Sequence, residues 1–127
     1  MRLSRLSHAV KVTLVRGGKK SMAKDAAQAG AVNRANVQHY RWGTDCDGWH
    51  LVKDEQLSVI EELMLPGAAE IRHHHRRAQQ FFYILSGEVA MEVEGQTTRV
   101  PAGSGIRVLP GKQHQIRNPR RARRGFW

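Results

Sequence analysis

The part of the chain between residues 57 and 118 is a succession of short, β-rich stretches separated by turns that contain glycine or proline. In one of them, Val89, Met91 and Val93 alternate with more polar neighbours, which is typical of a strand with one face in contact with water. A tight turn at Gly95 leads into a β-branched stretch that favours pairing back on this strand. The stretches that we expect to be strands are residues 57–65, 80–85, 88–94, 97–100, 106–109 and 113–118. Hairpins in this order predict an all-β fold, an antiparallel jelly-roll β-barrel.

Three consecutive histidines stand in the middle of the chain, between a Pro-Gly turn and the apolar stretch at residues 80–85. If the backbone is extended here, Ile71, His73 and His75 point to one face, because successive side chains of a strand alternate between its two faces. Two imidazoles on one face can bind a transition-metal ion without distortion of the backbone. Gln80, near the start of the next strand, is placed to face the same two histidines.

A further histidine follows the same pattern of strand, turn and strand. After the stretch at residues 106–109 comes a Pro-Gly turn, and His114 lies just beyond it, on the same strand face as Ile116. His8, His39, His50 and His74 belong to no such pattern, and histidines of this kind are more often surface or core residues than ligands.

Together these stretches resemble the two motifs of the cupin superfamily. The residues that match the first motif are Gly67, His73, His75, Gln80 and Gly87, with every spacing kept. Those that match the second motif are Gly103, Gly111, His114 and Asn118. Glutamine stands where the family usually has glutamate, and Leu109 stands where proline is usual. The resemblance covers about residues 59–118 and implies a metal site inside a small barrel, with His73, His75, Gln80 and His114 as ligands.

The role of Gln80 has two alternatives. Its neutral carbonyl oxygen either coordinates the ion directly or accepts a hydrogen bond from a bound water. Compared with a carboxylate, the amide leaves the site of a divalent ion with one more positive charge. Imidazole suits Fe, Mn, Ni, Cu and Zn alike, so that the ligands indicate one divalent transition-metal ion without naming it.

The function implied by the resemblance is that of a small metal-dependent enzyme that acts on an oxygen-bearing metabolite by dioxygenase, isomerase or lyase chemistry. The alternative is a non-catalytic module that binds a sugar or an effector. No catalytic residue is assigned, but Glu61 and Glu62 must point to opposite faces of their strand. One of them therefore enters the barrel as a general base, or both are solvated at a sheet edge. A homodimer, common in the family, is expected.

The charge of the chain divides it into three parts. Residues 1–37 carry eight Lys or Arg and one acid, residues 119–127 carry four Arg, and residues 38–118 carry nine Lys or Arg against ten acids. We therefore expect a flexible basic N-terminal arm, a barrel domain at residues 38–118, and an Arg-rich tail in place of a truncated last strand. Aromatic residues do not alternate with the basic ones, which disfavours nucleic-acid binding.

Two further features bear on the compartment. No apolar stretch is long enough to span a membrane, so membrane partners are not expected. Cys46 is the only cysteine, which excludes a disulfide within the chain and favours a reducing cytoplasm.

Overall fold

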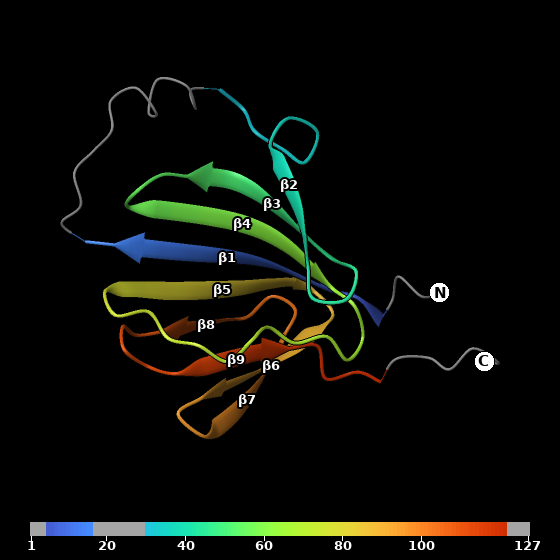
Figure 1. Ribbon diagram of the computed structural model, residues 1–127. Coiled ribbons are helices and arrows are strands. Elements are labelled where there is room, and N and C mark those ends of the chain that lie inside the picture. The colour runs from blue at the N-terminus through green and yellow to red at the C-terminus, as the bar shows by residue number, and fades with distance from the viewer. Residues whose placement is uncertain (1–4, 17–29, 122–127) are drawn as a thin grey trace.

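The computed structural model describes residues 5–16 and 30–121, which form two antiparallel sheets (Figure 1). The larger, six-stranded sheet has the order β2-β3-β4-β1-β5-β8, and the smaller, three-stranded sheet has the order β7-β6-β9. The strands are β1 (Ser7–Val15), β2 (Gln38–Trp42), β3 (Cys46–Lys53), β4 (Leu57–Met64), β5 (Ala78–Ser86), β6 (Glu88–Val93), β7 (Gln96–Pro101), β8 (Gly105–Val108) and β9 (His114–Arg117). This is the all-β, jelly-roll architecture predicted from the sequence.

The predicted strands between residues 57 and 118 are confirmed to within one or two residues at each end. The β6–β7 hairpin shows why. Its turn residues Glu94 and Gly95 have φ angles of 50° and 89°, as the two-residue turn that matches the twist of a hairpin requires. Strand β6 pairs with β7 on one side and with β9 on the other, and this places the second motif beside β6.

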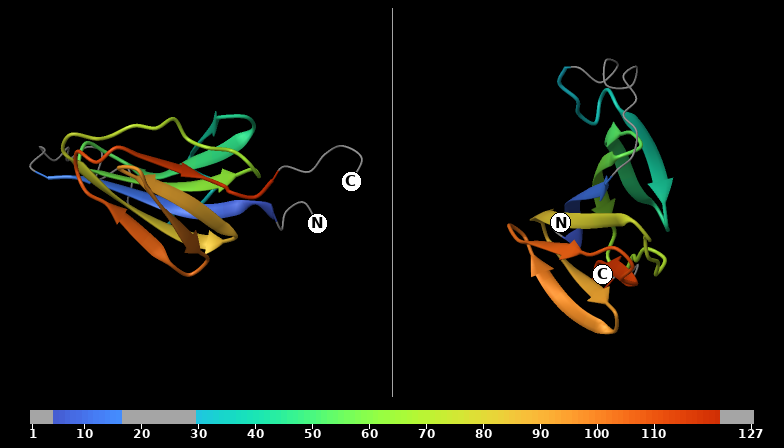
Figure 2. Two further views of the ribbon diagram at one scale, coloured as in Figure 1. Left: turned by 90° about the horizontal axis from the view of Figure 1, so that it is seen from below. Right: turned by 90° about the vertical axis from the view of Figure 1, so that its left-hand side faces the viewer.

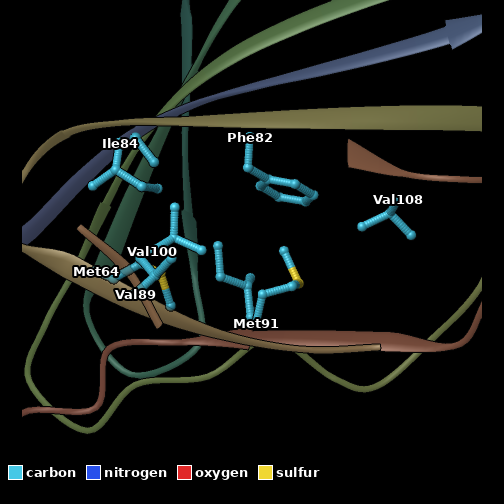
Figure 3. Packing of buried hydrophobic residues seen from close by; sticks show 9 residues of the cluster. Met64, Phe82, Ile84, Val89, Met91, Val100 and Val108 are labelled. Atoms are coloured by element: carbon cyan, nitrogen blue, oxygen red, sulfur yellow. The ribbon is translucent and has the colours of Figure 1, made fainter. Parts of the chain in front are cut away.

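The hydrophobic core lies between the two sheets. Phe82 and Ile84 on β5 point toward Val89 and Met91 on β6, and all four are fully buried (Figure 3). Burying each such side chain contributes roughly 1.5–3 kcal/mol. Further views show the smaller sheet lying against the β5–β8 end of the larger sheet, while the β2–β3 hairpin extends from its other end (Figure 2). The β2–β3 end is therefore free to hold polar side chains around a cavity.

The prediction of a flexible arm over residues 1–37 is wrong for residues 7–15. Residues 7–15 form β1, which pairs with β4 and β5 in the middle of the larger sheet (Figure 1). The sequence of β1 does not read as a buried strand, because polar Lys11 points inward whereas several apolar side chains point outward. Ala9 points into the core and Lys11 into the polar interior, while the apolar side chain of Leu14 is 39% exposed on the outer face. Residues 1–4 and 17–29 lie outside the described part of the chain.

Strands β1 and β5 carry a group of apolar side chains on the outer face of the larger sheet. Residues that lie opposite one another in an antiparallel sheet share a face, and the pairs Val12–Phe81 and Val10–Tyr83 place β1 and β5 side chains together. Phe81 and Tyr83 are 42% and 41% exposed. The other apolar residues of this outer face are Leu14, Leu57, Val59, Leu63 and Leu85.

The end of β9 is anchored by Asn118, the last residue of the second motif. Its buried side-chain amide donates hydrogen bonds to the carbonyl oxygens of Arg5 at 2.8 Å and Met64 at 3.0 Å. Residues 119–121 form no strand, and the rest of the predicted tail, residues 122–127, lies outside the described part. Within the described ranges the chain has no helix long and apolar enough to cross a membrane.

Candidate metal centre

Three of the four predicted ligands are histidines that meet at one end of the interior. His73 and His75 lie in the loop between β4 and β5, and His114 is the first residue of β9. The backbones of His73 and His114 exchange two hydrogen bonds, of 3.0 and 2.8 Å, in an isolated antiparallel bridge. One ring nitrogen from each of the three histidines lies within 4.8 Å of those of the other two. The segment 71–75 forms only this bridge and not a longer strand, yet the rings of His73 and His75 lie together as an extended backbone predicts, with their centroids 4.9 Å apart.

Backbone carbonyl groups fix the tautomer of two of these rings. His73 Nδ1 lies 2.7 Å from the carbonyl oxygen of Ile71, and His114 Nδ1 lies 3.0 Å from that of Lys112. A carbonyl group can only accept, so each Nδ1 carries the proton and each neutral ring presents a bare Nε2. Carbonyl groups orient the rings of metal-binding histidines in the same way.

The third ring supplies an unpartnered atom. His75 Nε2 is buried and has no hydrogen-bond partner among the residues that the structure describes. Burial, reinforced by His73 and His114, lowers the pKa of His75. Burial likewise lowers the pKa of His114, although its bond to the Lys112 carbonyl acts in the opposite direction. The neutral form, which is the form that binds metal ions, is thus favoured at both histidines.

Gln80, the fourth predicted ligand, is brought to the same place. It is 3% exposed, its Oε1 lies 2.9 Å from His114 Nε2, and its Nε2 donates to Thr13 Oγ1 at 2.9 Å. Because the Nδ1 of His114 holds the proton, the two atoms in contact are both acceptors, and they repel unless a cation lies beside them. Rotation of the Gln80 amide by 180° offers the other arrangement, in which its NH group donates to His114 and its oxygen accepts from Thr13.

The residues present therefore fit a divalent transition-metal ion. Three imidazole nitrogens and one amide oxygen form a donor set suited to such ions. A cation would supply the missing partner of His75 Nε2. It would also remove the repulsion between the facing acceptor atoms of His114 and Gln80. The other histidines take no part. His8 contacts Glu61, His39 contacts Asp47, His50 stacks on Tyr40, and His74 is exposed.

Of the two adjacent glutamates, Glu62 points into the interior and Glu61 points out. Glu62 is 1% exposed, whereas Glu61 binds His8 and Arg34 on the outer face, each at 2.7 Å. Burial raises the pKa of Glu62 to about 7, and Lys11 offsets only part of this effect while Glu70 adds to it. An inward carboxyl group that exchanges protons near neutral pH is suited to a general base.

The partners of Glu62 were not predicted from the sequence. Lys11 on β1 contacts Glu62 at 3.2 Å and Glu70 at 3.0 Å, and the hydroxyl group of Tyr40 lies 3.5 Å from Glu62. These side chains line a cavity of about 400 Å³ that extends to His73. Trp42 lines it as well. The only available signal was the alternation that places Lys11 on the same face of β1 as Ala9.

Both the sequence and the fold of this chain are similar to those of known proteins. A profile of the cupin domain matches residues 60–123. Among curated proteins, the polyketide synthase CurC of Streptomyces cyaneus is 27% identical over 56 residues, which are 44% of this chain. The match spans about a third of that relative, 36% of its length.

Two solved structures share the fold. An RmlC-like cupin from Shewanella frigidimarina has a TM-score of 0.63 and 22% identity, over 70% of this chain and 79% of that one. A predicted oxalate decarboxylase from Thermotoga maritima has a TM-score of 0.63 and 22% identity, over 73% of this chain and 90% of that one. Likeness at this level of identity concerns the fold alone.

Proposed function

This chain belongs to the cupin domain family, and we propose that it is a small metal-dependent enzyme acting on an oxygen-bearing metabolite. His73, His75 and His114 would hold one divalent ion, with Gln80 as the fourth ligand. The observation that carries this proposal is the convergence of three imidazole nitrogens within 4.8 Å, next to a cavity of about 400 Å³. Cavities of roughly 300–1,000 Å³ are usual for small-molecule sites.

The ion, when bound, would polarise a substrate oxygen as a Lewis acid or activate dioxygen. The chain itself supplies the surroundings. The carbonyl groups of Ile71 and Lys112 keep the rings of His73 and His114 in orientation. The hydroxyl group of Thr13 holds the Gln80 amide. Dioxygenase, isomerase and lyase chemistry are all compatible with such a site, and the substrate classes that fit are sugars, enols and carboxylates.

A second candidate is a non-catalytic module that binds a small molecule. One observation favours it: the contact between Gln80 and His114 is satisfied without an ion if the amide is turned by 180°. In that arrangement the cavity would hold an effector and the histidines would only line it. The cytoplasmic location remains a prediction under both functions.

Metal content separates the two functions. We would measure it by inductively coupled plasma mass spectrometry on untagged protein, beside a His73→Ala/His75→Ala variant and a His74→Ala control. His74 is exposed and lies between the two ligands, so its loss changes the histidine count but not the site. Near-stoichiometric metal in the wild type and in His74→Ala, lost in the double variant, is expected. No metal in any form after reconstitution would contradict the enzyme proposal and leave the binding module.

We also propose that two copies associate through the outer face of the larger sheet. Strand β1 directs Val10 and Val12 outward, in register with the exposed Tyr83 and Phe81 of β5. Apolar faces of this extent usually mark an interaction site. A second copy of the chain offers an equivalent apolar face, as a symmetric dimer requires.

A further inference from the structure

The cavity beside His73 contains two carboxyl groups that share one ammonium group. Glu62 Oε2 and Glu70 Oε2 lie 3.2 and 3.0 Å from Lys11 Nζ. All three side chains are 13% exposed or less. None of them belongs to the three-histidine group, and Lys11 lies outside the segment that matches the cupin profile.

The second oxygen of each carboxyl group lacks a donor within the described part of the chain. Glu62 Oε1 and Glu70 Oε1 are buried and have no hydrogen-bond partner among the described residues. A buried carboxylate oxygen without a donor is costly, so each requires a proton or a ligand that donates one. Both carboxyl groups line the cavity, which is where such a ligand would lie.

The charge of the cluster indicates the chemistry of this ligand. Burial and the charge of Glu70 raise the pKa of Glu62 to about 7, while the attraction of both glutamates outweighs burial and raises the pKa of Lys11. Near neutral pH, Glu62 is present in protonated and ionised forms, and the ionised form is the one that can accept a proton from a ligand. With the ammonium group of Lys11, the cluster as a whole carries at most one net negative charge. It therefore offers little attraction to a cationic group, and the free carboxylate oxygens disfavour an anionic one. An uncharged hydroxyl group, which can donate to them, fits best.

Tyr40 and the other groups around Glu62 complete the environment. Burial, with the charge of Glu62, raises the pKa of Tyr40 to about 12, so its hydroxyl group stays protonated. The titratable groups that face Glu62 are Lys11 from β1, Tyr40 from β2, Cys46 from β3 and Glu70 from the loop before β5, with His50 stacked beyond Tyr40. Trp42 and Ile71 add apolar surface to the same cavity.

We propose that Glu62 and Glu70, bridged by Lys11, form a proton-accepting subsite for a small dihydroxylated ligand, whose second oxygen reaches the His73 end of the cavity. The contact at that end rests on the proposed metal-dependent function. In the step at Glu62, the O–H bond of the ligand breaks and its proton forms a new O–H bond on Glu62 Oε1. The electron pair stays on the ligand oxygen, so negative charge moves from Glu62 to the ligand and nothing is oxidised or reduced.

The test uses catechol, a small ring with two neighbouring hydroxyl groups that is uncharged near neutral pH. Its binding to the zinc-loaded full chain would be measured by calorimetry in two buffers of different ionisation enthalpy, which counts the protons released. The variants are Glu62→Gln and Glu70→Gln, with Glu61→Gln as the control that points to the opposite face. Circular dichroism would establish that each variant is folded.

Wild type and Glu61→Gln are expected to bind catechol equally and, at pH 8, to release few protons to the buffer. Glu62→Gln should bind about tenfold more weakly or worse, as the loss of a charged hydrogen-bond partner requires, and release up to about one more proton. Glu70→Gln should also weaken binding. Equal affinity and equal proton release in Glu62→Gln and Glu61→Gln would overturn the subsite, and so would a wild type that does not bind catechol.

A repeat with metal-free protein separates this inference from the metal proposal. If zinc leaves the affinity of the wild type for catechol unchanged while Glu62→Gln still weakens binding, the metal end fails and the subsite stands. If zinc strengthens binding but Glu62→Gln behaves like Glu61→Gln, the metal end stands and the subsite fails.

Discussion

Replacement of Glu62 by glutamine should stabilise the protein above neutral pH. The folded state binds a proton at Glu62 more tightly than the unfolded chain does, since the pKa rises from 4.5 to about 7 on folding. A carboxyl group of this kind costs no stability at low pH, and stability falls as the pH rises from 4.5 through 7. At about 1.4 kcal/mol for each tenfold change in proton affinity, the loss is roughly 3 kcal/mol. An uncharged amide of the same shape avoids it.

Urea unfolding at several pH values between 5 and 8 measures this effect as a difference between two proteins. The free energy of unfolding of Glu62→Gln minus that of wild type should increase by about 2.5 kcal/mol over this range, because part of the loss already occurs below pH 5. The slope of the free energy against urea concentration should be the same in the two proteins. The contribution of other groups cancels in the difference. Glu61→Gln is the matched control. Although burial of Glu61 acts the other way, its bonds to Arg34 and His8 lower its pKa, so this variant should lose stability at pH 7.

A difference that stays constant with pH would refute the reasoning, because Glu62 would then titrate alike in the folded and unfolded states. A difference that decreases as the pH rises would refute it more strongly. In that case Lys11 would hold Glu62 ionised in spite of its burial, and the proton-accepting subsite would lose its physical basis.

Other predictions concern the metal, the cavity wall and the outer face. Zinc at about 100 times its dissociation constant should stabilise wild type and His74→Ala by about 2.7 kcal/mol but not His75→Ala, as thermal unfolding would show; an equal gain in all three contradicts the site. Gly48→Ala should destabilise by about 1–3 kcal/mol in urea, because its Cβ would collide with the ring of Tyr40; unchanged stability would mean that the ring moves freely. Tyr83→Glu should convert a dimer into a monomer in light scattering, because it places a charge on the outer face; a monomeric wild type would contradict the proposed interface.

The strands from β4 to β9 could be predicted because the alternation of apolar residues and the turn residues of each stretch agree with the burial of its side chains in the fold. In β5, for example, the buried side chains of Phe82 and Ile84 alternate with exposed ones, and Gly87 ends the strand with a φ of 72°. Two of the three histidines could be placed for a similar reason. His73 and His75 lie two residues apart, so local spacing puts these two on one face. The resemblance to the two cupin motifs, and not spacing, predicts that His114 joins them. The sequence did not predict that only an isolated bridge joins His73 to His114.

The cluster around Glu62 could not be predicted, because it joins residues far apart in the chain. Lys11, Tyr40 and Glu70 come from three segments that meet only when β1 lies between β4 and β5. The sequence could show that either Glu61 or Glu62 enters the barrel, but not which one. That choice depends on the register of β4 against β1, in which Ala9 lies opposite Glu62.

Strand β1 connects the two halves of the site, although its sequence resembles a basic arm. Lys11 holds the carboxyl groups of Glu62 and Glu70, and two residues further on Thr13 holds the amide of Gln80. Because the two side chains share one face of one strand, a change in the register of β1 would move both together. The proposed metal site and the proposed proton-accepting subsite therefore both depend on the pairing of β1 with β4 and β5. The outward position of the apolar side chains of β1 follows from the same arrangement: its inward face carries Lys11 and Thr13, and its outward face forms part of the proposed dimer interface.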